Sequence, residues 1–151
     1  TRDRRQRQMC IRDRLNKNAA DGLKPFDIHA VTDVTGFGLL GHLAEICKGS
    51  KVSAEIYFSD LDFLPSVENL AKSGIIPGGT KRNFEYLIND MEFDPKFSDA
   101  QRYLTCDAQT SGGLLIALSP EDAKIFVDSI YPKAKIIGHI SDKNSNLIKV
   151  T

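Results

Sequence analysis

Cysteine is scarce in this chain of 151 residues: Cys10, Cys47 and Cys106 are its only three, and they lie far apart. Their spacing fits no metal-ligand motif, and an odd, sparse count argues against a disulfide scaffold and indicates a reducing compartment. Long apolar runs are also missing, since none approaches the roughly 20 residues needed to span a bilayer. The first residues show no signal-peptide pattern. We therefore expect a cytoplasmic protein with no transmembrane segment and no membrane partner.

The chain as a whole also has no excess of positive or negative charge, although the two signs are unevenly distributed along it. The formal net charge is zero, from 20 Lys and Arg against 20 Asp and Glu. Residues 1–17 carry seven bases and two acids, a net of +5, which leaves 13 bases and 18 acids, a net of −5, in the other 134 residues. A mildly acidic body without a basic stripe argues against nucleic acid as its main partner.

The basic leader, residues 1–14, has too few apolar residues to form a core. Its Met9, Cys10 and Ile11 are consecutive and follow no helical period. Such a segment cannot offset the entropy of ordering, so we predict that it is disordered. It could be a basic arm for RNA or an anionic membrane, an inert tail, or foreign to the protein, because residues 8–14 resemble translated sequencing adapter. We predict that residues 15–151 form one domain.

The chain from residue 15 to residue 58 alternates between helical and extended patterns. A short helical stretch over 15–23 is followed by a predicted strand, Ile28–Val34, where β-branched residues alternate with others. A second strand is predicted over Val52–Phe58. Between the two strands a helix is predicted, with Gly49 as its expected C-terminal stop. One face of this helix carries Leu39, Leu40, Leu43, Ile46 and Cys47.

The second half of the chain continues in the same way. A polar stretch, 92–102, follows a predicted helix whose i, i+3, i+4, i+7 face carries Phe84, Leu87, Ile88 and Met91. Leu114–Leu118 is predicted to be a buried strand, and Ser119 to cap the helix after it. Residues 135–140 and 147–150 are expected to form a terminal hairpin. The alternation of strands and helices predicts a single domain of mixed α and β structure.

The most informative segment places an acidic residue at a strand end, then a glycine-rich turn, then a helix start. Asp33 ends the strand, and Thr35, Gly36, Phe37 and Gly38 form the turn. Glycines let the backbone approach a ligand closely, and free N–H groups at a helix start bind phosphate. A neighbouring carboxylate suits Mg²⁺, which takes one or two carboxylates together with phosphate oxygens. A tight strand–helix turn with no ligand would explain the same pattern.

Two further questions stay open in this segment. Gly36, Gly38 and Gly41 have the spacing of a dinucleotide-binding fingerprint, in which an acidic residue follows about 20 residues on. Only Glu55, 19 residues after Gly36, comes near that place, so a dinucleotide fold is not excluded by pattern alone. His42, on the first turns of the helix, is either a packed or capping histidine, which we favour, or an acid–base group.

A second glycine-rich segment, Pro77–Thr80, is predicted to be a loop. It contains Gly78 and Gly79, and the charged residues Lys81 and Arg82 follow it directly. Those two side chains could face phosphates or could be solvated loop charges.

A third segment begins at Cys106 and leads into the strand over Leu114–Leu118. Asp107 could bind a metal ion, but we favour a hydrogen bond within its own loop, as is common for Asp in turns. No base is placed by sequence near Cys47 or Cys106. We therefore expect both to be small buried hydrophobes and not nucleophiles.

In this order along the chain, the three segments closely resemble the C-terminal domain of the selenophosphate synthetases, or selenide, water dikinases. The matching runs are Ile28–Leu43, Pro77–Asn83 and Cys106–Leu115. Residues 15–17 also resemble the helix that precedes this domain in the family, so the resemblance covers about residues 15–151. Ala108 stands where the family pattern usually has proline, and we expect that loop to be slightly looser here.

The resemblance implies both a chemistry and a place for it. Selenophosphate synthetases are ATP-using dimers of the aminoimidazole ribonucleotide synthetase superfamily that convert selenide, ATP and water to selenophosphate, AMP and phosphate with Mg²⁺. By alignment Asp33 joins the metal–phosphate cluster. The residues expected to line the nucleotide loops are Thr35, Gly36, Phe37, Gly38, Gly78, Gly79 and Thr80. The catalytic cysteine or selenocysteine and the main ATP-binding domain belong to a preceding N-terminal domain, and Cys10 matches no catalytic motif.

We therefore expect the C-terminal domain fragment of a selenophosphate-forming phosphotransferase, inactive by itself. Its expected fold is α+β, a single domain with a mixed β-sheet covered by helices. Its expected partners are ATP, selenide and the missing N-terminal domain of the same enzyme, with a homodimer in the intact enzyme. One alternative is a domain of a related purine-pathway synthetase, against which Phe37 between the glycines and the Thr110–Gly113 segment argue. The other is a ligand-binding module without catalysis.

Overall fold

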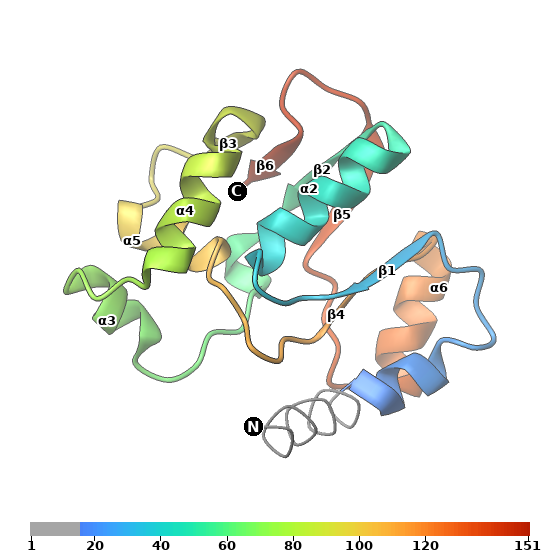
Figure 1. Ribbon diagram of the computed structural model, residues 1–151. Helices are drawn as coiled ribbons and strands as arrows, with labels where there is room; N and C mark the ends of the chain where they lie inside the picture. Colours follow the sequence, from blue (N-terminus) through green and yellow to red (C-terminus); the bar gives the residue numbers. More distant parts are fainter. Residues whose placement is uncertain (1–15) are drawn as a thin grey trace, which may run out of the picture. The chain divides into compact units, whose positions relative to one another are not determined.

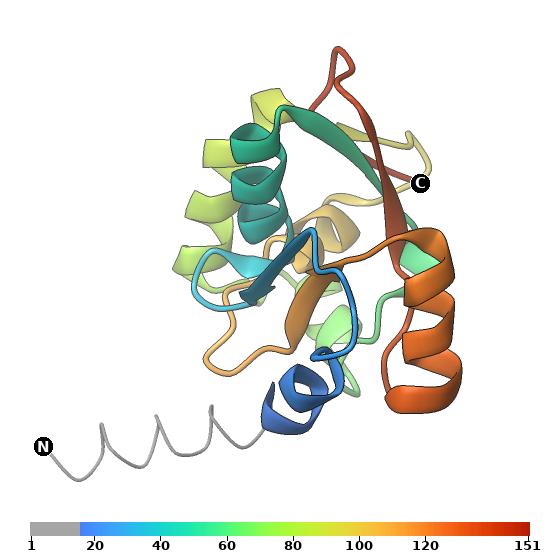
Figure 2. The ribbon, with the colours of Figure 1, turned by 90° about the vertical axis from the view of Figure 1, so that its right-hand side faces the viewer.

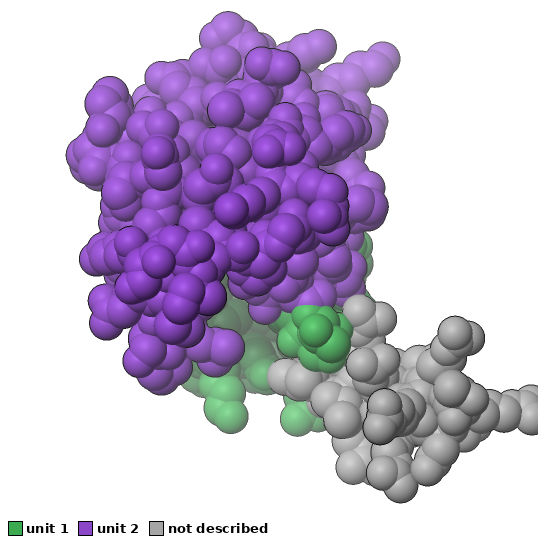
Figure 3. Space-filling view, turned by 60° about the vertical axis from the view of Figure 1, so that its left-hand side comes forward, with its two compact units in different colours: residues 1–34, 110–135 green, residues 35–109, 136–151 purple. Residues whose placement is uncertain are grey.

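The computed structural model describes residues 16–151, which fall into two compact units coloured separately in Figure 3. The first unit comprises the chain up to Val34 together with Thr110–Lys135. The second comprises Thr35–Gln109 and Ile136–Thr151. The predicted disorder of residues 1–14 and the assignment of Cys10 lie outside the described residues.

The first unit joins a two-stranded antiparallel sheet to helices. Its elements are a helix over residues 16–22, β1 (Ala30–Asp33), β4 (Leu114–Ala117), α6 (Pro120–Ile125) and a π-helical turn, Phe126–Ile130 (Figure 1). In the register of the two strands, Ala30 lies opposite Ala117 and Asp33 opposite Leu114. The core of this unit is made of Ala19, Leu23 and Phe126. The strand predicted from Ile28 is therefore confirmed, with its start two residues later.

The start of α6 follows from its sequence alone. The Ser119 hydroxyl accepts a hydrogen bond from the Asp122 backbone N–H at 3.1 Å, and Pro120 occupies the first turn, where its missing N–H costs nothing. Glu121 and Asp122 place negative charge at the positive end of the helix dipole. The predicted cap is thus confirmed.

The second unit is built on a four-stranded mixed sheet in the order β3-β6-β2-β5. Its strands are β2 (Val52–Ile56), β3 (Met91–Phe93), β5 (Gly138–Asp142) and β6 (Ile148–Val150). Its α-helices are α2 (Gly38–Ser50), α3 (Val67–Lys72), α4 (Gly78–Leu87) and α5 (Asp99–Thr105). Figure 2 shows α2 and α4 on one side of this sheet. A mixed sheet covered by helices confirms the predicted α+β class.

The core of the second unit lies between α2 and the sheet. Every third or fourth residue of α2 points toward the sheet, and every second residue of the strands points toward α2. The buried apolar side chains that these elements contribute are Leu40, Leu43, Ala44, Cys47, Ala54, Ile56, Met91, Ile148 and Val150. This packing fixes the position of the N-terminus of α2, which matters for the site below.

The C-terminal end of α2 differs from the prediction. The helix continues through Gly49 and ends at Ser50, and Lys51 takes the left-handed conformation with φ 57°. The Lys51 N–H then bonds to the Cys47 carbonyl oxygen. Because β2 begins at Val52, the chain must reverse at residue 51, and a lysine takes the conformation usually left to glycine. The assignment of Gly49 as the stop was wrong.

The helical face predicted from Phe84 to Met91 is interrupted. Helix α4 ends at Leu87, a 3-10 turn covers Ile88–Asp90, and Met91 opens β3. Met91 lies opposite Ile148 in the parallel β3–β6 pair, so pairing with a distant strand overrides the helical period. Helix α5 (Asp99–Thr105), which the prediction missed, also begins within the polar stretch 92–102.

The expected terminal hairpin is wrong. Strands β5 and β6 both pair with β2, β5 in antiparallel and β6 in parallel orientation. Strand β2 therefore lies between them, and the two last strands do not contact each other as a hairpin. Two strands close together in the sequence often form a hairpin, but here each of them pairs with a different edge of β2.

None of the helices formed by residues 16–151 has the length and apolar character of a membrane span.

Candidate functional site

The turn Thr35–Gly38 and the start of α2 are held by a close backbone contact. Gly38 has φ +70°, and a Cβ added there would lie 2.6 Å from the carbonyl carbon and oxygen of Cys106. Only glycine combines this left-handed conformation with so close an approach. Gly36 differs, because a Cβ there would meet nothing within 4 Å. The first helical turn of α2 therefore packs directly against the backbone of the segment that begins at Cys106.

Hydrogen bonds join the turn to the same segment. The Asn83 carboxamide donates to the Gly36 carbonyl oxygen at 2.9 Å and to the Cys106 carbonyl oxygen at 3.1 Å. The Gln109 backbone N–H donates to the Thr35 carbonyl oxygen at 3.0 Å. Because Asn83 belongs to α4, one side chain links the turn, α4 and the start of the third segment within the second unit.

The segment Pro77–Thr80 is not a loop, and this prediction was wrong. Gly78, Gly79 and Thr80 form the first turn of α4, with Pro77 as the extended residue before it. The physical reason is that the first three N–H groups of a helix need no partner within it, so glycines and a preceding proline are tolerated there. The fourth residue, Lys81, bonds through its N–H to the Pro77 carbonyl oxygen at 3.2 Å.

Asp107 is anchored by hydrogen bonds to two neighbouring residues. Its Oδ1 accepts from the buried Thr80 hydroxyl at 2.5 Å, and its Oδ2 accepts from Gln109 Nε2 at 3.2 Å. A carboxylate with both oxygens engaged inside the protein ties α4 to the segment after α5. The preferred prediction for Asp107, a hydrogen bond within its own loop, is confirmed.

His42 lies under the turn as a buried, hydrogen-bonded side chain. Its Nε2 is 3.0 Å from the Thr35 hydroxyl oxygen, and its Nδ1 is 3.2 Å from Glu45 Oε2. Its ring meets the Phe37 ring edge-on, with centroids 5.7 Å apart. The prediction of a packed histidine is confirmed, whereas Phe37 itself is 59% exposed.

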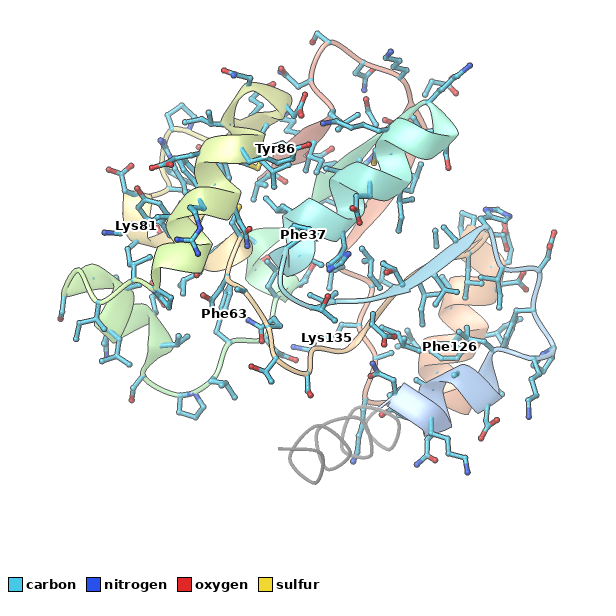
Figure 4. All side chains as sticks on the ribbon, viewed as in Figure 1. Phe37, Phe63, Lys81, Tyr86, Phe126 and Lys135 are labelled. Atoms are coloured by element: carbon cyan, nitrogen blue, oxygen red, sulfur yellow. The ribbon has the colours of Figure 1, made fainter. Side chains whose placement is uncertain are left out.

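Exposed aromatic and basic side chains lie next to this assembly. Figure 4 labels Phe37 at the start of α2 and Lys81 and Tyr86 on α4. Lys81 and Arg82 are exposed, and the Lys48 ammonium lies 5.6 Å from the centroid of the exposed Tyr86 ring. The two basic residues therefore follow the first turn of α4 at the surface of the second unit.

Asp33 belongs to the first unit. It ends β1, its side chain is exposed, and it makes no side-chain hydrogen bond or ion pair with any other residue of the described part of the chain. The strand pair closes just beyond it, where the Val34 N–H donates to the Gly113 carbonyl oxygen at 2.9 Å. A Cβ on Gly112 would lie 2.3 Å from the Val34 carbonyl oxygen, so glycine is needed there.

The buried thiols are unsuited to nucleophilic chemistry. Cys47 and Cys106 are fully buried and free, and burial raises the pKa of each thiol to about 11. At neutral pH both stay protonated, and the thiolate is the reactive form. The prediction that they are small buried hydrophobes is confirmed.

Carboxylates, thiols and imidazoles are too dispersed here to hold a metal ion by themselves. Within residues 16–151, no three or more His, Cys, Asp or Glu residues come together in an arrangement that could bind one. A single exposed carboxylate such as Asp33 fits one position of a Mg²⁺ shell, which also takes phosphate oxygens and water.

Three residues of the site were missed in the sequence: Asn83, Gln109 and Glu45. Asn83 and Gln109 stand inside the quoted motifs, so their position was visible, but no local pattern shows that they bond to Gly36 and Thr35. Glu45 follows His42 by three residues, a spacing that places two side chains on the same face of a helix. That spacing was the available signal.

Comparisons with known proteins identify the family of this chain. A family model described as AIR synthase related protein, C-terminal domain, matches residues 5–150. The selenide, water dikinase of Photorhabdus laumondii is 43% identical over 148 residues, which cover 94% of this chain and 40% of that protein. The enzyme of the same name from Yersinia pseudotuberculosis is 51% identical over 125 residues, covering 81% of this chain and 33% of its own.

A third relative is more distant in sequence. The selenide, water dikinase of Aliarcobacter butzleri is 38% identical over 138 residues, which cover 89% of this chain and 40% of that protein. The chain therefore spans 33–40% of the length of these three relatives. The resemblance indicated by the three sequence motifs is confirmed.

Proposed function

The chain belongs to the AIR synthase related proteins, as their C-terminal domain, and from this premise we propose that it is the C-terminal part of a selenide, water dikinase. In that role it contributes a loop and a carboxylate to a Mg–ATP site that a larger enzyme completes. ATP, selenide and water are the proposed substrates, and selenophosphate, AMP and phosphate the proposed products.

One structural observation supports the proposal more strongly than any other. The turn Thr35–Gly38, the first turn of α4 and the segment from Cys106 to Gln109 are joined through Asn83 and through the Thr80–Asp107 hydrogen bond. These are the segments that resemble the family motifs, and the fold of the second unit brings them together. Shared motifs scattered over a surface would not support a common site.

The turn and the two helix starts suit phosphate. The Gly38 N–H bonds to the Thr35 carbonyl oxygen at 3.0 Å, whereas the N–H groups of Gly36 and Phe37 have no backbone acceptor within residues 16–151. Free N–H groups beside the N-terminus of α2 and in the first turn of α4 attract anions. Thr35 to Gly38 and Gly78 to Thr80 are therefore the proposed nucleotide-loop residues.

Asp33 is the proposed metal-binding residue of this chain. Its carboxylate is exposed and unpartnered by any residue of 16–151, and it precedes Thr35 by two positions. Asp33 would supply one carboxylate ligand to Mg²⁺, whose positive charge would offset the negative charge that develops as phosphoryl groups are transferred. Since the described residues supply no metal-binding cluster, the other carboxylates are proposed to come from the part of the relatives that this chain does not span.

A chimeric enzyme tests the proposal. Residues 15–151 replace the matching part of the Photorhabdus laumondii relative, and ATP consumption with and without selenide is measured. We expect selenide-dependent release of AMP and phosphate. Asp33→Asn should lower the rate about 100-fold or more, the scale seen when one electrostatic group that acts in the transition state is removed.

The matched control is Asp27→Asn. Asp27 is exposed and lies in the same unit, six residues before Asp33, so the variant removes the same charge outside the proposed site. It should keep the rate of the unmodified chimera. A folded chimera without selenide-dependent turnover, or an Asp33→Asn variant as active as its parent, would contradict the proposed function.

A further inference from the structure

A chain of hydrogen bonds leads from an exposed carboxylate on α2 to the turn that precedes this helix. Glu45 Oε2 lies 3.2 Å from His42 Nδ1, and His42 Nε2 lies 3.0 Å from Thr35 Oγ1. The His42 side chain is 10% exposed and that of Glu45 65%. With its edge-on contact to Phe37, this one buried imidazole touches two of the four residues of the turn.

The carboxylate decides the direction of these hydrogen bonds. An ionised carboxylate can only accept, so His42 donates from Nδ1. A neutral imidazole carries one proton, which leaves Nε2 as an acceptor. The Thr35 hydroxyl therefore donates to Nε2, and its proton is directed toward the helix and not toward a ligand.

Thr35 is thus held at two atoms. Its hydroxyl is bound by His42, and its carbonyl oxygen accepts from the N–H groups of Gly38 and Gln109, both at 3.0 Å. The N–H groups of Gly36 and Phe37 follow directly in the chain. The Thr35 carbonyl group and the Gly36 N–H share one peptide plane, so whatever fixes Thr35 also fixes the direction of the Gly36 N–H, while Asn83 holds the next peptide through the Gly36 carbonyl oxygen.

We propose that Glu45 and His42 are positioning residues, which select one imidazole tautomer, orient the Thr35 hydroxyl and hold the turn ready for phosphate. The phosphate as ligand rests on the proposed function. The tautomer and the restraint on the turn do not, and both can be measured without a nucleotide. A histidine that merely fills space needs no exposed carboxylate behind it, and this difference makes the proposal testable.

The first measurement is the ¹⁵N NMR signature of the His42 ring in the 151-residue chain, at a pH where the ring is neutral. We expect a protonated Nδ1 and an unprotonated Nε2. In Glu45→Gln the neutral amide can also donate, so the preference for the proton at Nδ1 should weaken and both ring signals should move. A wild-type ring with its proton on Nε2, or ring signals that do not move in Glu45→Gln, would overturn the proposal.

The control for this measurement is Glu68→Gln. Glu68 is a helical glutamate with its own cationic neighbour, Lys72, at 3.0 Å, and it lies on α3, away from the chain of hydrogen bonds. The variant removes the same charge from the same unit. Its His42 signals should match those of the wild-type chain, and movement equal to that in Glu45→Gln would mean that net charge alone is responsible.

The second measurement is hydrogen exchange at the Gly38 amide, which donates within the turn. Losing one hydrogen bond should raise the open population, and with it the exchange rate, about three- to tenfold. We expect this in Thr35→Val, which keeps the shape of the side chain but lacks the hydroxyl, and to a smaller extent in Glu45→Gln. Thr35→Ser keeps the hydroxyl and should retain the wild-type protection.

The results of this second measurement are equally decisive. Unchanged Gly38 protection in Thr35→Val, or a loss in Thr35→Ser as large as in Thr35→Val, would show that the hydroxyl does not restrain the turn. Neither measurement uses ATP or selenide. A chimera that fails to make selenophosphate would therefore overturn the proposed function and leave this inference intact, and the reverse also holds.

Discussion

The buried hydroxyl of Thr80 donates to Oδ1 of Asp107 at 2.5 Å, so the first turn of α4 is bonded to the segment that follows α5. The two residues are 27 positions apart in the chain. Each stands in a separate sequence motif, and the hydrogen bond gives a physical reason for the two motifs to occur together. We expect it to contribute measurably to stability.

Thr80→Val should lower the free energy of unfolding by about 1–3 kcal/mol, because a half-buried carboxylate oxygen is left without its donor. The measurement is urea unfolding followed by circular dichroism, which suits a chain without tryptophan. Thr80→Ser keeps the hydroxyl and should lose less than Thr80→Val. Equal losses in the two variants would assign the effect to the methyl group and its packing.

Gly38 and Gly49 should respond oppositely to alanine. At Gly38 the positive φ and the contact of 2.6 Å with the Cys106 carbonyl should make Gly38→Ala destabilising by about 3 kcal/mol or more. At Gly49, inside α2, nothing lies within 4 Å of the added Cβ, so Gly49→Ala should stabilise by about 0.5–1 kcal/mol. Urea midpoints of both variants check this, and destabilisation by Gly49→Ala would mean that the helix needs glycine at its end.

The buried thiols predict a loss of stability in alkali. Burial raises the pKa of Cys47 and of Cys106 from an ordinary 9.0 to about 11. Between these pH values the unfolded chain releases thiol protons that the folded chain keeps, so unfolding is favoured as the pH rises. The free energy of unfolding should therefore fall from about pH 9 to about pH 11, as measured by urea unfolding at each pH.

Cys47→Ala and Cys106→Ala serve as the comparison, since lysine and tyrosine side chains also titrate in that range. Each variant should be less stable at neutral pH by about 1–2 kcal/mol, because a small cavity replaces the thiol. Its decline with alkaline pH should nevertheless be shallower than in the wild-type chain. A slope identical to that of the wild-type chain would show that the thiol does not contribute.

The chain by itself should show no selenide-dependent consumption of ATP. It spans 40% of the Photorhabdus laumondii relative, and a single exposed carboxylate cannot hold Mg–ATP in a reactive geometry. The assay is the release of AMP with and without selenide, with the chimeric enzyme as the positive control. Turnover by the isolated chain that depends on selenide would contradict this expectation.

Local features of the structure follow from short stretches of sequence. Ser119 caps α6, and the apolar face of α2 is buried, because each depends on residues within one or two helical turns. The start of α5 also depends only on residues within one helical turn. Ser98 and Gln101 form a capping box there, a signature that was present in the sequence and overlooked in a stretch judged only by its polarity.

The arrangement of the sheet could not be obtained in this way. Strand β2 takes β5 on one edge and β6 on the other, and β3 joins through β6, although β3 and β6 are far apart in the chain. An alternating pattern shows that a segment has one apolar face, but it does not show which other strand supplies the hydrogen bonds at its edge. That choice depends on all strands at once.

The caps of α5 and α6, the apolar face of α2, the residues of the three motifs and their likeness to one family can all be read from the sequence, because each is a property of residues close together in the chain. Only the folded chain brings the Asn83 side chain to the carbonyl oxygens of Gly36 and Cys106, and the Thr80 hydroxyl to Asp107. These bonds join groups on different elements, and they form only when packing against the sheet has brought the elements within about 3 Å of each other's polar atoms.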